Sequence, residues 1–316
     1  MIACKSPLQP FAATCKSDGE ITAQGHESID EVALKFVQDA LGLAPSEAYR
    51  IYTDDAKASV PLDRFAASFR EFASNGPYKD LRVAHTYLVK LTGGTQDRHI
   101  VCGNLADPNN SVMVIAEPGN VLAHVIIEGK ADNNSINFVV SLISEQVHWR
   151  VQYVHYALVA IAGRSARDLQ RMAIAQDEKH HIFNTFILYT AAFQLTDRGP
   201  NLELGIRPEI QRAVMAIQSP PDLRGRAPYI WTYARSTFKI LTLEPVGIDG
   251  KLYLRLDQEI EPWKDGKQAD RRNRALIRGF TGAHPEYRDV FAGLIVRAHE
   301  RGGSREFKTI EGNEHD

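Results

Sequence analysis

The chain has 316 residues, of which 44% are hydrophobic and 24% charged, and its formal net charge at pH 7 is -2. This composition is typical of a globular protein, and the length favours two domains. A net charge so close to zero gives no electrostatic reason to expect a nucleic acid or an anionic membrane as partner. The apolar runs, such as YALVAIAG at 156–163, fall short of the ~18 residues of a membrane-spanning helix.

The N-terminal residues 1–27 contain two prolines, two glycines and many polar residues without a sustained apolar period. They therefore predict a flexible tether. Order is expected from Ser28, which stands three residues before Glu31 in the spacing of a capping box. Apolar residues at helical spacing predict three helices, over residues 28–41, 45–52 and 61–74.

The pattern changes from helical to extended between residues 81 and 160. Six β-branched or aromatic segments, separated by short polar or glycine-bearing loops, predict the strands of an antiparallel meander. These segments are 81–91, 98–105, 111–117, 121–130, 135–143 and 147–161. Alternation is clearest at Val147, Trp149, Val151 and Tyr153, which predicts one buried and one wetter face for the last strand.

The C-terminal half predicts helices followed by a small α+β domain. One long helix is expected to about residue 196 because the segment lacks proline and glycine, and a short helix is expected over 207–217. Residues 218–228, with three prolines, predict a linker. A hairpin, a helix over 266–279 and further strands follow, and the run 288–299 fits either a strand or a helix.

Two charged motifs have the residue types of a phosphate-binding patch or a metal site. The basic run KQADRRNRALIR at 267–278 stands beside five acidic residues between 257 and 270, which favours a solvated helix face over a phosphate-binding patch. Glu-x-x-His occurs at 145–148 and at 178–181, as in carboxylate-bridged di-iron bundles. The first match falls on a turn and a strand, and the second lacks bridging glutamates on neighbouring helices. We therefore predict no metal and no cofactor.

Helices followed by a meander ending in HWRVQYVHY, the passage DDAKASVPLDRFAASFREFASNGPYKDLR and the final-strand Trp149 together resemble the nuclear-transport-factor-two-like superfamily. The resemblance covers about residues 28–160. The superfamily includes ketosteroid isomerases, polyketide cyclases and many non-catalytic secreted modules. The resemblance implies an α+β fold in which N-terminal helices pack on a strongly curved antiparallel sheet to form a cone, followed here by a long helix and a smaller α+β domain.

Four domain segments are therefore predicted. They are a tether over 1–27, the cone domain over 28–162, a helical segment over 163–218 and a small α+β domain over 229–310.

The resemblance also implies an apolar cavity with one open mouth, suited to a small apolar ligand. His85 and Tyr87 are the catalytic candidates, as general base and hydrogen-bond donor, and with Trp149 and Tyr153 they are the candidates for lining the cavity. The alternative for His85 is a core or rim histidine satisfied by a backbone carbonyl, or a residue at a subunit contact. A cavity closed by aromatic side chains, or a His85 outside the cone, would count against an enzyme.

The three cysteines add a hypothesis about location. The opening residues M-I-A-C loosely fit the box before the lipidated cysteine of a bacterial lipoprotein, with Met1 in place of the usual leucine. Cys4 would then carry the lipid, and Cys15 and Cys102 would be left to form a disulfide in an oxidising compartment. The alternative is an ordinary cytosolic start with three reduced thiols.

Two functions remain open from the sequence. The first is a non-enzymatic exported bacterial protein, periplasmic and attached to a membrane only through a lipid anchor, that binds a small apolar ligand or a protein partner through the cone domain. The alternative is an isomerase, cyclase or hydratase that uses a histidine in the cone cavity, and a cytoplasmic location also stays open. A homodimer formed through the sheet is a further option.

Overall fold

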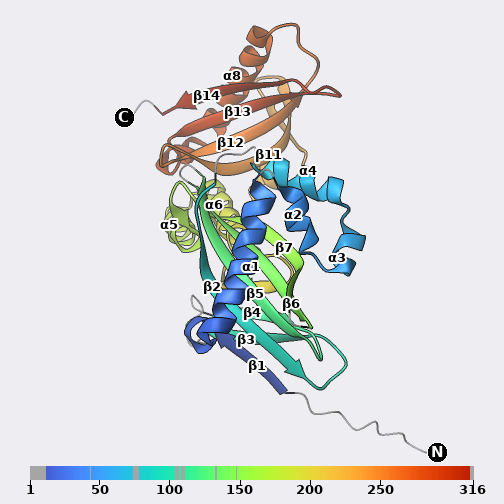
Figure 1. Ribbon diagram of the computed structural model, residues 1–316. Coiled ribbons are helices and arrows are strands. Elements are labelled where there is room, and N and C mark those ends of the chain that lie inside the picture. The colour runs from blue at the N-terminus through green and yellow to red at the C-terminus, as the bar shows by residue number, and fades with distance from the viewer. Residues whose placement is uncertain are drawn as a thin grey trace, which may run out of the picture. The chain divides into compact units, whose positions relative to one another are not determined.

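The structure is a computed structural model that describes residues 12–42, 44–73, 78–103, 107, 111–131, 134–146 and 148–313. Its fold is α+β, as predicted: N-terminal helices, a curled antiparallel sheet, further helices, and a mixed sheet with its own helix (Figure 1). The described chain forms two compact units. The first runs to Val159 and also includes Thr196–Arg207, and the second comprises Ala160–Leu195 and the residues from Pro208 onward.

The first unit contains the helices and strands expected from the sequence between residues 28 and 161. Its helices are α1 (Ala23–Leu41), α2 (Pro45–Arg50), α3 (Asp54–Ser59) and α4 (Leu62–Ala73). Its strands are β1 (Ala12–Ser17), β2 (Lys79–Thr92), β3 (Arg98–Gly103), β4 (Ser111–Ala116), β5 (Val121–Ala131), β6 (Asn134–Glu145), β7 (His148–Ile161) and β9 (Leu202–Leu204), with β7 continuing into the second unit. The helix α1 begins five residues earlier than predicted.

The strands do not form one simple meander. The curled sheet has the order β1-β2-β5-β6-β7-β8, where β8 is Arg164–Ser165. The strands β3 and β4 leave it and pair with β9 in a separate three-stranded sheet, in the order β3-β4-β9. The sequence pattern does not reveal this detour, because a strand alternates in the same way whichever neighbour it pairs with.

A hydrophobic core packs on each face of the curled sheet, and successive residues of β5 point to opposite cores. Val125 belongs to the helix-side core, which it shares with Phe36 of α1, and Ile126 belongs to the strand-side core, which it shares with Val114 of β4. A strand buried on both faces reads as a continuous apolar run. This explains the nearly continuous apolar run VLAHVII in the sequence, which only His124 interrupts.

Residues 12–27, expected within a flexible tether, are structured in their described part. Strand β1 pairs antiparallel with β2, from Ala12 opposite Thr92 to Ser17 opposite Tyr87, and a short 3-10 helix, η1 (Asp18–Glu20), leads into α1. A disulfide from Cys15 ties β1 to β3 as well. The polar composition of this segment predicted a tether. It is nevertheless compatible with a strand, because an edge strand held by a disulfide does not need a strong apolar period. Cys4 lies outside the described residues.

The second unit combines helices with a five-stranded mixed sheet. Its helices are α5 (Ala166–Glu178), α6 (Ile182–Gln194), α7 (Arg207–Ala216) and α8 (Gly266–Ala283), with 3-10 turns η2 (Pro221–Leu223) and η3 (Pro285–Asp289). Its strands are β10 (Tyr229–Tyr233), β11 (Ser236–Ile248), β12 (Lys251–Ile260), β13 (Gly293–Glu300) and β14 (Glu306–Gly312). The ambiguous run 288–299 is therefore mainly strand. Strands β12 and β13 are parallel and are joined by α8.

The single long helix predicted up to residue 196 is two helices, α5 and α6. The break is a Schellman motif. His180 has a φ of 59°, its N–H donates to the carbonyl of Asp177 at 2.8 Å, and the N–H of His181 donates to the carbonyl of Gln176 at 3.0 Å. This position usually carries glycine, and with histidine in its place the sequence offers no stop signal.

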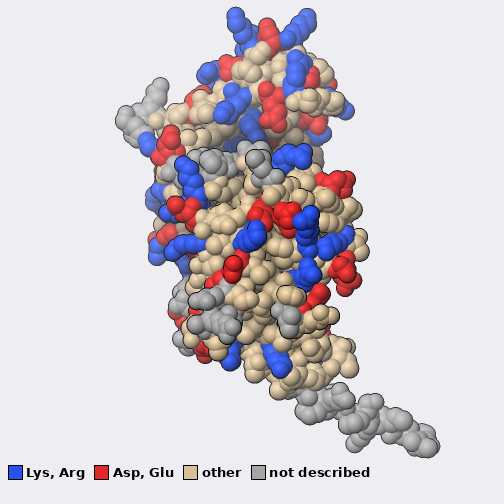
Figure 2. All heavy atoms as spheres, in the orientation of Figure 1, with Lys and Arg blue, Asp and Glu red and all other residues tan. Residues whose placement is uncertain are grey.

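Charges of both signs are interspersed on the face of the molecule shown in Figure 2. There, Lys and Arg side chains lie among Asp and Glu side chains on both the N-terminal and the C-terminal parts of the chain. Among the helices that the structure describes, none is long and apolar enough to cross a membrane.

Candidate functional site

His85, the predicted general base, lies at the surface. Its side chain is 53% exposed, and its Nδ1 atom is 3.1 Å from Oδ2 of Asp18. The other carboxylate oxygen of Asp18 accepts a hydrogen bond from the backbone N–H of Thr86 at 2.8 Å. The imidazole therefore pairs with a carboxylate at solvent and does not stand at the base of an apolar cavity.

Tyr87 has the opposite environment. It is 7% exposed and packs in the strand-side core with Val89 and Leu91. Burial, with a smaller contribution from Asp18, raises the pKa of Tyr87 to about 12, so the phenol is neutral at physiological pH. The His85 and Tyr87 ring centroids are 6.2 Å apart, but the two side chains differ in access to water.

The two remaining cavity candidates come from β7. Trp149 is half-buried and packs against the helix-side core, on the opposite side of the sheet from Tyr87. Tyr153 is also half-buried, and burial, aided by Asp197, raises the pKa of its phenol. The four predicted residues are thus distributed over two sides of the sheet.

Aromatic side chains fill the helix side of the curled sheet. Four aromatic residues from α1, α4 and the segment after α2 are at most 7% exposed: Phe36, Phe65, Phe69 and Tyr52. Their ring centroids lie 4.8 Å apart for Phe65 and Phe69 and 5.3 Å apart for Phe36 and Tyr52. These four aromatic side chains belong to the helix-side core.

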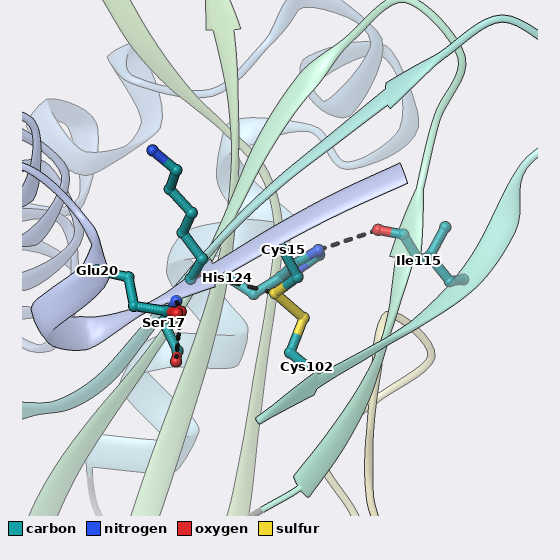
Figure 3. Close-up of a disulfide and its surroundings, with 7 residues drawn as sticks. Cys15, Ser17, Glu20, Cys102, Ile115 and His124 are labelled. Atoms are coloured by element: carbon teal, nitrogen blue, oxygen red, sulfur yellow. Dashed lines mark hydrogen bonds between the residues drawn. A yellow bond between two sulfur atoms is a disulfide. The ribbon is translucent and has the colours of Figure 1, made fainter. Parts of the chain in front are cut away.

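The strand side of the sheet contains a crosslink next to a buried histidine (Figure 3). Cys15 and Cys102, the predicted pair, form a disulfide that joins residues 87 positions apart in the sequence. Cys102 is 1% exposed and belongs to the strand-side core. The disulfide thus fixes the three-stranded sheet against β1 of the curled sheet.

His124 of β5 is a structural histidine. It is 1% exposed, and burial lowers the pKa of its imidazole to about 4, against an opposing hydrogen bond to Ile115. Its Nε2 donates to the carbonyl of Ile115 at 3.2 Å, since a carbonyl can only accept. Its Nδ1 then accepts from the hydroxyl of Ser141 at 3.0 Å. Both ring nitrogens are engaged and the ring is neutral, so it links β5 to β4 and β6.

The loop at 196–201 completes this region. The Nδ2 of Asn201 donates to Ser141 Oγ at 3.3 Å, and the backbone N–H of Ile115 donates to the carbonyl of Asn201 at 3.1 Å. Gly199 has a φ of 81°, and a Cβ at this position would lie 2.8 Å from the side chain of His155. Only glycine permits this approach, which also places Asp197 Oδ2 3.2 Å from His155 Nε2.

A polar cavity of about 170 Å³ lies where this loop meets β3 and β4. Its lining residues are His99, Met113, Ile115, Asp197, Arg198, Gly199, Pro200, Asn201, Leu202, Glu203 and Arg207. Arg198 is 7% exposed. Burial is the main cause that lowers its pKa to about 10; Asp197 opposes the shift and the like charge of Arg207 adds to it.

The sequence did not reveal this cavity, because DRGPNLELG (197–205) lies between the two helices expected to end at about residue 196 and to begin at 207 and has the composition of a connecting loop. The segment instead supplies β9, a glycine at positive φ and an arginine and an asparagine that line the cavity. The polar residues around Gly199 and Pro200 predict a loop, but they do not show that this loop packs against β3 and β4.

The metal motifs gain no support from the geometry. Glu178 ends α5 and His181 precedes α6, so the second Glu-x-x-His match is not on one helix. Within the described ranges, no group of three or more His, Cys, Asp or Glu side chains is arranged to hold a metal ion.

No protein-family model matches the chain, and neither a curated protein nor a solved structure matches it significantly. The likeness that can be stated is one of architecture: helices followed by a strongly curled antiparallel half-barrel, consistent with a nuclear-transport-factor-two-like cone.

Proposed function

We propose that this chain is an exported, non-catalytic binding protein of the nuclear-transport-factor-two-like type, and that its first unit binds a small carboxylate in the polar cavity. The observation that carries the proposal is a buried arginine, Arg198, that lines this cavity together with a second arginine, Arg207.

Both arginines have partners in the protein: Arg198 Nη1 donates to the carbonyl of Asp197 at 2.6 Å, and Arg207 Nη1 donates to Thr196 Oγ1 at 3.1 Å. An anion bound beside the two guanidinium groups would offset part of the free-energy cost of burying Arg198. A carboxylate accepts two parallel hydrogen bonds from a guanidinium fork, and the amide of Asn201 lines the same cavity as a further polar group. A volume of about 170 Å³ suits a ligand of a few heavy atoms. Glu203 on the cavity wall favours a ligand that also carries an amine.

The arrangement of histidines supports binding over catalysis. A general base needs access to the substrate and a pKa near the working pH. His85 is exposed and paired with Asp18, while His124 is enclosed, with both nitrogens engaged. His85 thus lies at solvent and not in an apolar cavity, and both ring nitrogens of His124 are hydrogen-bonded within the protein, so we place the enzyme alternative second.

Export is supported by the disulfide between Cys15 and Cys102, because disulfides persist mainly in oxidising compartments. A lipid at Cys4 would then be the membrane anchor. A thiol count on protein isolated without reductant tests export. Of the three cysteines, none should react before reduction and two should react after it, because a lipid at Cys4 occupies its sulfur and Cys15 and Cys102 are paired. Reactive thiols at Cys15 and Cys102 before reduction would contradict the export part of the proposal.

Ligand binding is tested by thermal unfolding in the presence of acetate, succinate, glycine and glutamate. We expect at least one carboxylate to raise the melting temperature of the wild type by a few degrees, because a ligand that binds the native state stabilises it. The shift should disappear in Arg207→Gln and persist in Arg212→Gln, which changes an exposed arginine of α7 outside the cavity. Equal shifts in both variants, or none in the wild type, would contradict the proposal.

A further inference from the structure

The second unit has a larger groove of about 700 Å³, within the size range of ligand sites. It lies where β11 and β12 meet the N-terminal half of α8. Its lining residues are Thr237, Lys239, Glu259, Ile260, Glu261, Trp263, Gln268, Arg271, Arg272, Ala275 and Arg301. Four basic side chains and two carboxylates therefore share one groove, which leaves a formal charge of +2.

Part of this charge is neutralised within the groove. Lys239 Nζ is 2.9 Å from Glu259 Oε1, and Arg301 is 2.8 Å from Glu261 and 3.9 Å from Glu259. These two cations and two carboxylates form a network of ion pairs whose formal charges cancel. The excess positive charge consequently comes from Arg271 and Arg272 of α8.

The two arginines differ in how they are held. Arg272 lies over the ring of Phe238, with its guanidinium carbon 4.1 Å from the ring centroid, and donates to the carbonyl of Thr237. Arg271 is exposed and, among the residues that the structure describes, makes neither a hydrogen bond nor an ion pair. Its donors are therefore available to a ligand.

The same helix carries basic residues that face elsewhere. Arg274 is 2.8 Å from Asp270 and 3.9 Å from Glu311 and does not line the groove. The basic run at 267–278, expected as a uniform solvated face, is thus divided between a neutralised side and a side that lines a groove. The period of the helix produces this division, since residues three to four positions apart share a face.

The groove also has an apolar wall. Ile260 and Trp263 line it while being only 9% and 6% exposed, and they belong to a small core with Ala269, Ala298 and Phe307. The guanidinium of Arg305 lies 4.9 Å from the Trp263 ring centroid. Core packing and Arg305 thus fix the position of the indole, and Arg271, Arg272 and Arg301 line the same groove.

We infer that this groove binds a phosphomonoester that carries an apolar or aromatic group. The dianionic phosphoryl group would match the excess charge of +2 and accept hydrogen bonds from Arg271 and Arg272, and the apolar group would lie against Ile260 and Trp263. The inference concerns the second unit and does not depend on the carboxylate proposed for the first.

The test is a calorimetric titration of the full chain with phenyl phosphate, inorganic phosphate and phenol. Phenyl phosphate should bind most tightly because it alone has both a phosphoryl group for Arg271 and Arg272 and an aromatic ring for Ile260 and Trp263. Arg271→Gln should raise the Kd for phenyl phosphate about tenfold, which is the usual effect of losing one charge-assisted hydrogen bond. The matched control is Arg278→Gln, an exposed arginine on the same helix outside the groove, which should bind as the wild type does.

Vesicles containing 20% phosphatidic acid in phosphatidylcholine distinguish a lipid headgroup from a soluble ester. Binding of phenyl phosphate that depends on Arg271 supports a soluble ligand, and vesicle binding with the same dependence supports a lipid source of the same phosphoryl group. Failure of both probes, or equal binding by the Arg271→Gln and Arg278→Gln proteins, would overturn the inference. Because Arg271 is exposed and unpaired among the described residues, the variant should fold normally, and an unchanged melting temperature verifies this.

Discussion

At the scale of single residues, His124 makes stability depend on pH. Its folded-state pKa is about 4, below the ordinary value of 6.5, so the unfolded chain binds more protons between these values. The free energy of unfolding should therefore fall as the pH drops from 6.5 towards 4, by about 3 kcal/mol for this group when fully expressed.

Urea unfolding at several pH values measures this effect. His124→Asn should be less stable at pH 7 because it loses part of the Ser141 and Ile115 contacts, but its free energy of unfolding should vary less between pH 6.5 and 4. His148→Gln, at an exposed position, should retain the wild-type dependence. An identical pH dependence in His124→Asn would show that another group is responsible.

Gly199 is a second residue whose identity the fold requires. An alanine there would adopt an unfavourable positive φ, and its Cβ would meet the side chain of His155 at 2.8 Å. We expect Gly199→Ala to lower the free energy of unfolding by about 2–3 kcal/mol, combining strain and overlap. Gly119→Ala, with a φ of 79° and nothing within 4 Å, should lose only about 1–2 kcal/mol. Equal losses in thermal unfolding would contradict the close approach.

At the scale of elements, the disulfide joins the edge strand β1 of the curled sheet to β3 of the three-stranded sheet. Cys15 of β1 and Cys102 of β3 close a loop of 87 positions, which restricts the unfolded chain. The double variant Cys15→Ser/Cys102→Ser should lose about 2–4 kcal/mol of stability. Denaturant unfolding with and without reductant checks this: reductant should destabilise the wild type and leave the double variant unchanged. A wild type insensitive to complete reduction would contradict the crosslink's structural role.

The same elements show what the sequence could reveal. The three N-terminal helices, the extended segments between 81 and 161 and the α+β character of the C-terminal part follow from local periodicity. The pairing of β4 with β9 does not, because strands β5 to β8 and helices α5 and α6 separate Val112–Val114 from Leu202–Leu204 in the sequence. Likewise the alternation of β7 indicates that Trp149 lies on a buried face, but periodicity does not show that His85 is 53% exposed and paired with Asp18.

At the scale of the whole molecule, the two units are interleaved in sequence. The chain leaves the first unit after Val159, returns for Thr196–Arg207 and leaves again. A contiguous fragment 1–162 would therefore lack β9 and the loop that contacts β4 and Ser141. We expect it to melt at a lower temperature than the first unit does in the intact chain, and calorimetry with separate transitions would measure the difference. An equally stable fragment would show that residues 196–207 contribute little.

We propose that the first unit binds a small carboxylate through Arg198 and Arg207, both of which belong to the segment Thr196–Arg207. The most direct measurement is a calorimetric titration of the wild type and of Arg207→Gln with the carboxylate that stabilises the protein most. We predict one binding site per chain in the wild type and an affinity at least about tenfold weaker in the variant, because one charge-assisted pair is lost. Wild-type affinity in Arg207→Gln, or the absence of any carboxylate binding to the wild type, would contradict the account.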